Sequence, residues 1–315
     1  MFATQNDIDE TFGIVESYWG KPKRDRRILI YHCDYHCNIQ CEHCLITEKI
    51  RTDFPGRIPD DIAERLIMEA GKNNLAVYPV SGDPWCWYDY LKNFLLPMCE
   101  KYNTRRLIST NGKWGEDPTL IKEALELPIQ NLILTVDYYH QKHIPIQSIN
   151  NILDAFKNHP TKVFIASCFT IQHPLSEVSN MLKYRIPIYP LPLIEYNEYF
   201  DNNRHIPGLF YRKQYNGEIV HCRPQMFFVN DFAGNLYREC ASFLRGYPCL
   251  VGNIMETSMA DLIKKKDTMR LKYKLYGEFD QGAPHTEACV WGQTHGQITN
   301  FFEDRVHIID NRNKV

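Results

Sequence analysis

Three closely spaced cysteines, Cys37, Cys41 and Cys44, form a C-x3-C-x2-C pattern in a polar segment of the sequence. A compact loop with this spacing can turn three thiolates toward one site, and soft thiolate ligands favour iron–sulfur clusters over hard cations. Three protein ligands would leave one iron of a four-iron cluster open to chelate a small molecule. The spacing therefore predicts an iron–sulfur site with a free coordination position.

Two alternatives compete for the same cysteines. A structural zinc loop would recruit His36 or His43, but structural zinc normally has four ligands in two separated pairs, and no second pair lies close in the sequence. Inert buried cysteines would have to coincide in a loop that is rich in Asp, His, Asn, Gln and Glu. Iron–sulfur ligation explains this group of thiols better than either alternative.

The bulk composition limits the class of protein. The chain has 315 residues, of which 44% are hydrophobic, and a formal net charge of −2. These values fit one large α/β domain with a smaller appendage, and they give no reason to expect nucleic acid or an anionic membrane as a partner. The sequence has no apolar run of about 18 residues and no signal peptide pattern. We therefore expect a cytoplasmic protein, in which 11 cysteines indicate metal ligation rather than disulfides.

Short apolar runs alternate with helical patterns between residues 27 and 195. The expected strands are Arg27–His32, Leu75–Val80, Arg106–Thr110, Asn131–Val136, Val163–Phe169 and Ile186–Leu191. The expected helices are Pro59–Ala70, Tyr88–Tyr102 with an interruption near Pro97, one that opens after Asp117 and Pro118, Gln147–Asn158 and Ser176–Tyr184. Six such units in series imply a parallel sheet with right-handed crossovers, either doubly wound or a partial barrel.

Polar segments follow the carboxyl ends of the first four expected strands. The cysteine segment follows the first strand, residues 81–84 the second, residues 111–112 the third, and residues 137–140 the fourth. In parallel α/β sheets, ligands bind at the carboxyl ends of the strands. We therefore expect the four segments to meet around one site.

The C-x3-C-x2-C motif after a first strand, with His43 before its last cysteine, resembles the radical S-adenosylmethionine (SAM) superfamily. The resemblance covers about residues 27–195 and implies a partial (β/α)6 barrel of the TIM type. It also implies that the three cysteines hold a [4Fe–4S] cluster whose open iron binds SAM. Reduction of that cluster would cleave SAM to a 5′-deoxyadenosyl radical, which abstracts a substrate hydrogen atom. An anaerobic reaction and an electron donor such as flavodoxin or ferredoxin are implied as well.

Three later segments resemble SAM-binding positions of the same superfamily, in the same order. Residues 81–84 stand where the family has Gly-Gly-Glu-Pro, a site for the SAM ammonium, although Gly-Asp-Pro alone also reads as an ordinary turn. Residues 109–112 resemble the family's Thr-Asn-Gly segment near the methionine and ribose, and residues 134–137 resemble the end of the fourth strand near the ribose. The residues assigned to SAM in this way are His43, Ser81, Gly82, Asp83, Pro84, Ser109, Thr110, Asn111, Thr135 and Asp137.

A second set of cysteines, Cys222, Cys240, Cys249 and Cys289, lies in the C-terminal third. Residues 225–240 predict a β-hairpin with its turn at 231–235, and a helix is expected over Ser258–Tyr273. The hairpin and residues 251–254 resemble the twitch and SPASM extensions of radical SAM enzymes. This resemblance implies an auxiliary [4Fe–4S] cluster on these cysteines, with His285 or substrate as alternatives to Cys249. Unligated core cysteines are the other interpretation.

The predicted organisation has four parts. Residues 1–26 are an N-terminal extension, 27–200 the barrel, 205–290 a twitch-like domain, and 291–315 a C-terminal tail.

The substrate class stays open between two hypotheses. One is a ribosomally made peptide that is epimerised, crosslinked or oxidised. The other is a small molecule that is dehydrogenated with the auxiliary cluster as electron acceptor. A non-enzymatic metal-binding scaffold is a third possibility. The candidate substrate residues are Asp137, Tyr138, His140 and Glu195, and Cys168 is a candidate hydrogen-atom donor, with a solvated loop and a core thiol as the plain alternatives.

Overall fold

The computed structural model describes Phe2 and residues 27–44, 46, 48–170, 172–192, 227–237 and 250–266. Strands and helices alternate regularly from β1 to β6 in this part of the chain. The part of the last expected helix beyond residue 266 lies outside the described residues.

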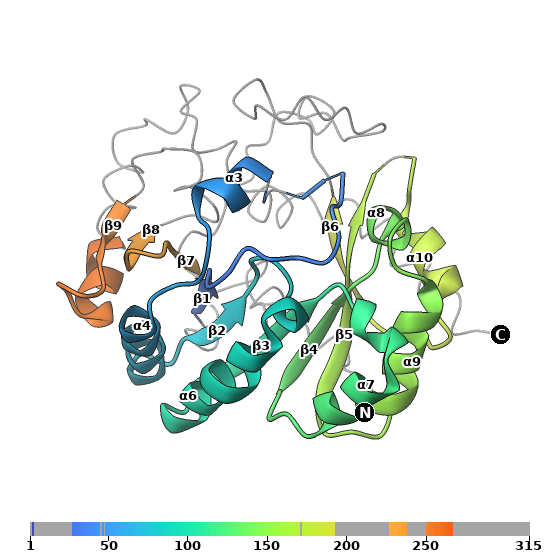
Figure 1. The fold of residues 1–315 in the computed structure, drawn as a ribbon, viewed down its shortest axis with the longest axis horizontal. Coiled ribbons are helices and arrows are strands. Elements are labelled where there is room, and N and C mark those ends of the chain that lie inside the picture. The colour runs from blue at the N-terminus through green and yellow to red at the C-terminus, as the bar shows by residue number, and fades with distance from the viewer. Residues whose placement is uncertain are drawn as a thin grey trace, which may run out of the picture.

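A nine-stranded sheet forms the centre of the molecule, in the order β6-β5-β4-β3-β2-β1-β7-β8-β9 (Figure 1). Its strands are β1 (Ile28–Tyr31), β2 (Ala76–Pro79), β3 (Arg105–Thr110), β4 (Asn131–Thr135), β5 (Lys162–Phe169), β6 (Ile188–Pro192), β7 (Phe227–Asn230), β8 (Asn235–Tyr237) and β9 (Leu250–Asn253). Neighbours from β6 to β7 are parallel, whereas β8 is antiparallel to both β7 and β9. The predicted α/β class, with six parallel strands in sequential order, is confirmed.

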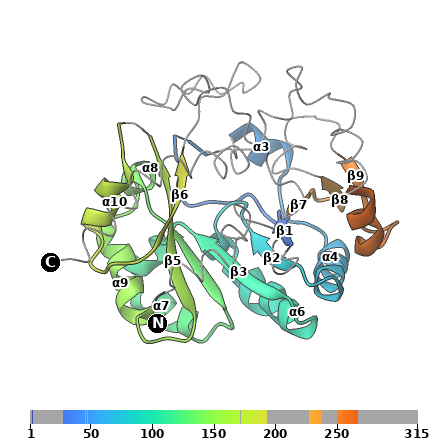
Figure 2. The same cartoon turned by 180° about the vertical axis from the view of Figure 1, so that it is seen from behind.

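Helices connect the parallel strands. They are α3 (Glu48–Asp53), α4 (Asp60–Lys72), α5 (Tyr88–Tyr90), α6 (Leu96–Lys101), α7 (Pro118–Leu125), α8 (Tyr138–Gln141), α9 (Ile146–Phe156) and α10 (Leu175–Met181), with short turns η1 (Pro84–Trp87), η2 (Leu91–Leu95) and η3 (Lys113–Glu116). Figure 1 shows α6, α7 and α9 in front of the strands, and Figure 2 shows the strands in front of these helices. These three helices therefore form a layer on one face of the sheet. None of the described helices is long and apolar enough to cross a membrane.

The helix expected over Tyr88–Tyr102 forms with a wider turn in its middle. Between α5 and α6, η2 is π-helical, and Leu96 donates its backbone N–H to the carbonyl of Leu91, five residues earlier. Pro97 follows at once; it has no N–H, and its ring excludes the usual carbonyl four residues back. The wider turn lets the helix continue past the proline, which explains the predicted interruption.

The C-terminal strands continue the same sheet. β7 pairs with β1, and Asn230 at its end exchanges two hydrogen bonds with the backbone of His32. The side-chain amide of Asn230 donates to the His32 carbonyl at 2.8 Å, and its oxygen accepts the His32 N–H at 3.1 Å. Asp231 forms the predicted turn by accepting the N–H groups of Ala233 and Asn235. The hairpin is thereby attached to the chain just before the cysteine segment.

A C-terminal helix over residues 259–266 packs beside α4. The carboxylate of Glu69 in α4 accepts the N–H of Met259 at 3.1 Å, which satisfies one of the free amides at the start of that helix. Arg65 of α4 donates to the carbonyl of Ile254 at 3.4 Å. These two contacts join the last described elements to the first strand–helix unit.

Asn230→Ala would remove both hydrogen bonds between β7 and His32. Two buried backbone groups would lose their partners, at roughly 1–3 kcal/mol each. We expect the free energy of unfolding in urea to fall by about 2–6 kcal/mol. Asn158→Ala is the matched control, because Asn158 is exposed and should change stability by less than about 0.5 kcal/mol. Equal stability of the two variants would contradict this role of Asn230.

Candidate functional site

The segment after β2 supports the cysteine segment that leaves β1. Ser81 accepts the N–H of Cys33 on its hydroxyl oxygen at 3.2 Å, and Asp83 donates its N–H to the carbonyl of His36 at 2.8 Å. Between them, Gly82 has a φ of +62°, and a Cβ on it would lie 2.1 Å from the His36 carbonyl oxygen. Only glycine fits this close approach. The first two polar segments therefore meet, as the sequence predicts.

The Asp83 carboxylate connects the segments after β2 and β3. It is buried, and one oxygen accepts the N–H of Asn111 at 2.7 Å and the hydroxyl of Thr110 at 2.9 Å. The other oxygen accepts the N–H of Trp85 at 3.0 Å, which caps η1. Burial raises the pKa of Asp83, although these hydrogen bonds oppose the rise. The resemblance assigns the Asp83 carboxylate to the SAM ammonium. In the structure, both oxygens of this carboxylate hold neighbouring loops in place.

Asn111, at the end of β3, faces the cysteine segment. Its side-chain amide donates to the Asn38 side chain at 2.8 Å and to the sulfur of Cys37 at 3.7 Å. On the neighbouring strand ends, the hydroxyls of Ser109 and Thr135 lie 3.4 Å apart. The third predicted segment therefore also reaches the site.

The three thiols of the motif form no disulfide and lie close enough to affect one another. Cys41 is buried, and Cys37 and Cys44 are partly buried. Burial raises the pKa of Cys37 to about 12, and the negative charges of Asp83 and Cys44 add to this rise. Burial likewise raises the pKa of Cys44, with a further contribution from Cys41. Three soft donors on one loop, which would have to be held as thiolates, fit an iron–sulfur cluster.

A buried carboxylate, Asp137, closes the site at the end of β4. One of its oxygens accepts the backbone N–H of His140 at 2.9 Å and lies 2.8 Å from its ring Nδ1. The other oxygen accepts the N–H of Cys168 at 3.3 Å and lies 3.8 Å from the Nε2 of His43. Burial alone would lower the pKa of His140, but the charge of Asp137 raises it well above its usual value. Conversely, the two histidines hold the pKa of Asp137 well below its usual range against the effect of burial.

Side chains from the cysteine segment, from residues 137–140 and from the end of β5 converge around His43. Its ring nitrogen, a ring nitrogen of His140 and the sulfur of Cys41 all lie within 4.8 Å of one another. The ligand atoms of His43, Asp137 and Cys168 are equally close. The structure therefore places the candidate hydrogen-atom donor Cys168 beside the motif, at the end of β5.

The remaining candidates lie at the rim or outside the described residues. Tyr138 is 37% exposed, and its ring stacks on His173 at 3.4 Å between centroids. His36, the other histidine of the zinc alternative, has a side chain that is 68% exposed and is bonded to Asp34. Glu195, Cys222, Cys240, Cys249, His285 and Cys289 lie outside the described residues.

Several contacts of the site were not anticipated from the sequence. Lys142 bonds to Glu42 at 2.8 Å and connects α8 to the cysteine segment. Trp85 and Trp114 stack with ring centroids 4.2 Å apart, and they come from the two segments that Asp83 joins. These residues belong to no spacing pattern, and each partner is distant in the sequence. Only their position after the ends of successive strands could have indicated them.

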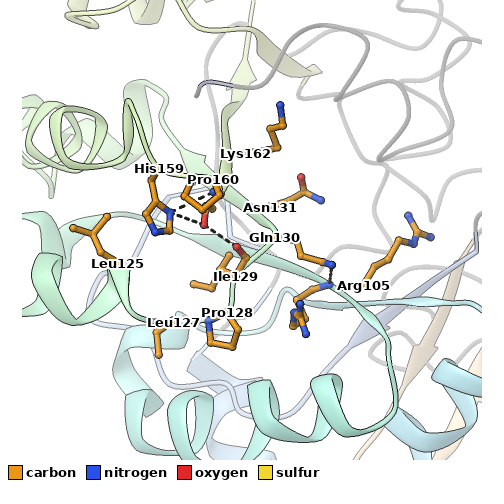
Figure 3. A pocket seen from close by; sticks show the side chains of 12 residues that line it. Arg105, Leu125, Leu127, Pro128, Ile129, Gln130, Asn131, His159, Pro160 and Lys162 are labelled. Carbon is orange, nitrogen blue, oxygen red and sulfur yellow. Dashed lines mark hydrogen bonds between the residues drawn. The ribbon is translucent and has the colours of Figure 1, made fainter.

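A surface hollow lies at the amino ends of the parallel strands (Figure 3). Its lining includes Arg105, Asn131 and Lys162, which are the first residues of β3, β4 and β5. The cysteine segment follows the end of β1 instead. The hollow therefore does not belong to the site described above.

No protein-family model and no curated protein matches this sequence. Solved structures do resemble it. The structure of hexahistidine-tagged anSMEcpe with bound AdoMet matches with a TM-score of 0.57 and 16% identity, over 92% of this chain and 96% of that chain. Native anSMEcpe with bound AdoMet and the Kp18Cys peptide matches with a TM-score of 0.58 and 16% identity, over 92% of this chain and 99% of that chain. At this level of identity, the likeness shows that the chains share a fold.

Gly82→Ala would force a methyl group onto the His36 carbonyl and displace the cysteine segment. Gly56→Ala is the matched control, because Gly56 also has a positive φ, of +96°, but nothing lies within 4 Å of its Cβ position. The control should lose only about 1 kcal/mol of unfolding free energy from backbone strain. We expect Gly82→Ala to lose more stability and also most of its capacity to take up iron and sulfide at the motif. Equal losses in both variants would contradict this role of Gly82.

Proposed function

We propose that this chain is a radical SAM enzyme. The observation that carries the proposal is the arrangement of three thiols, Cys37, Cys41 and Cys44, on a loop after β1 at the carboxyl ends of a (β/α)6 sheet. The fold match to anSMEcpe with bound AdoMet supports it. A bound [4Fe–4S] cluster with SAM would supply one-electron cleavage of SAM and a carbon radical that removes a hydrogen atom from the substrate.

The residues of this chain would position both groups. The backbone of residues 81–83 would receive the SAM ammonium, with Asp83 shaping that backbone through its bonds to Thr110 and Asn111. The hydroxyls of Ser109 and Thr135, which lie 3.4 Å apart, would face the ribose. Hydroxyl and backbone groups of this kind suit the hydrogen-bonding hydroxyls and charged amino group of SAM.

The substrate of the proposed enzyme is a ribosomally made peptide. The support is that the structure of native anSMEcpe was solved with a peptide, Kp18Cys, and that its fold matches 92% of this chain. Tyr138 and His173, whose rings stack, offer an aromatic surface for substrate. Dehydrogenation of a small molecule is the alternative, and the products formed from candidate peptides and alcohols would distinguish the two.

An auxiliary [4Fe–4S] cluster belongs to the same proposal. Its ligands would be Cys222, Cys240, Cys249 and Cys289, and it would accept the electron left after hydrogen-atom abstraction. The described hairpin β7–β8 and the helix at 259–266 agree with the predicted twitch-like order of elements. Flavodoxin or ferredoxin would serve as the electron donor.

A metal-binding scaffold is the second candidate function. It is favoured by the group of Cys41, His43 and His140, whose ligand atoms lie within 4.8 Å of one another and suit zinc. This site would use one cysteine of the motif, whereas the radical SAM proposal needs all three. Metal analysis together with cysteine variants separates the two functions.

Replacement of any one motif cysteine by alanine should abolish SAM cleavage. Anaerobically reconstituted enzyme and dithionite would be incubated with SAM, and 5′-deoxyadenosine would be measured by chromatography. We expect roughly a 100-fold loss or more for Cys37→Ala, Cys41→Ala and Cys44→Ala, because a four-iron cluster needs all three thiolates. Cys99→Ala, which removes a buried thiol of α6 away from the motif, is the control and should retain activity. If the wild-type protein binds zinc instead of iron and forms no 5′-deoxyadenosine, this result would favour the scaffold function.

The triple variant that lacks Cys37, Cys41 and Cys44 tests the auxiliary cluster. It should retain about four iron atoms per chain after reconstitution, because the C-terminal cysteines supply their own ligand set. Iron content below about one atom per chain would count against a second cluster.

A further inference from the structure

His140 has no counterpart in the SAM-binding segments, yet it is one of the most constrained side chains at the site. It lies in α8, its side chain is 11% exposed, and its backbone N–H and ring Nδ1 both contact one oxygen of Asp137. Its carbonyl accepts the N–H groups of His143 and Ile144. Backbone and ring are therefore fixed together.

The His140 ring lies close to both Asp137 and the motif. Asp137 occupies Nδ1 at 2.8 Å, so Nε2 is the nitrogen without that partner. A ring nitrogen of His140 lies within 4.8 Å of the sulfur of Cys41, and both residues are buried. A carboxylate and a ligand thiolate only accept hydrogen bonds, so a ring beside both of them can contact them only as a donor.

A second ligand sulfur has a donor of the same kind. The side-chain amide of Asn111 lies 3.7 Å from the sulfur of Cys37 and donates to it. Asn111 and His140 follow the ends of different strands, β3 and β4. The loops of the sheet thus bring polar hydrogens to two of the three sulfurs.

We propose that His140, oriented by Asp137, donates a hydrogen bond to the sulfur of Cys41 and raises the reduction potential of the cluster that Cys41 would hold. Reduction adds negative charge to an iron–sulfur cluster, and a donor at a ligand sulfur stabilises that charge. Cys41 and His140 are both buried, and a hydrogen bond is stronger in buried surroundings than in water. His140 is a positioning and tuning residue, not a ligand, and this inference rests on the proposed radical SAM function.

Redox titration of the reconstituted full-length chain, monitored by electron paramagnetic resonance without SAM, tests the proposal. The Cys41→Ala variant identifies the signal of the cluster at the motif, because that signal should be absent from its spectrum. We expect its midpoint potential to become more negative in His140→Phe, and to shift less in His140→Gln, whose amide can still donate. His143→Gln is the matched control, since His143 is exposed in the same turn, and its midpoint should equal that of the wild type.

Pulsed resonance on protein labelled with 15N-histidine gives a second measurement. The wild type and His143→Gln should show a coupling between the reduced cluster and the His140 nitrogen, and this coupling should disappear in His140→Gln. A coupling from His43, whose ring nitrogen also lies within 4.8 Å of the Cys41 sulfur, should remain in all three proteins. A midpoint in His140→Phe and His140→Gln that equals the wild-type value would overturn the proposal. Loss of the cluster from both variants would overturn it as well, in favour of a purely structural role. A wild-type chain that takes up no cluster at the motif would instead refute the proposed function itself.

Discussion

The close approach of two backbone segments at Gly82 is the contact on which the rest of the site depends. The carbonyl of His36 occupies the space that any side chain at position 82 would need, and the same carbonyl accepts the N–H of Asp83. This contact sets the path of the chain between Cys33 and Cys37. The thiols of the motif point to one region because the second strand supports the loop of the first.

Two buried carboxylates extend this support around the sheet. Asp83 joins the loops after β2 and β3, and Asp137 joins the loop after β4 to His43 and to the carboxyl end of β5. A buried carboxylate is costly unless its oxygens are hydrogen-bonded, and every oxygen of these two residues has a donor or a nearby histidine. Each acid therefore holds its neighbours in one arrangement. The four loops form a single site because these acids cannot be left unsatisfied.

The C-terminal extension shows how a distant segment becomes part of the same framework. Asn230 places β7 on the free edge of β1, and Glu69 fixes the helix at 259–266 on α4. Tyr35, within the cysteine segment, stacks on Phe232 of the hairpin turn with ring centroids 5.0 Å apart. The cysteine segment is therefore held from both sides, by the loop after β2 and by the hairpin.

The sequence by itself determined the elements whose causes are local. Strands β1 to β6 follow from their apolar runs, the start of α7 follows from Asp117 and Pro118, and the hairpin turn follows from Asp231 and its neighbours. The motif cysteines and the polar ends of the first four strands could be recognised for the same reason. The tertiary structure alone decided that Asp83 turns toward Thr110 and Asn111, and that β7 pairs with β1. It also decided that His140 faces Cys41 rather than solvent. These contacts join residues that are far apart in the chain. The folded arrangement decides which donor reaches a buried carboxylate and which strand pairs with a free edge. Such long-range partners leave no periodic pattern in the sequence.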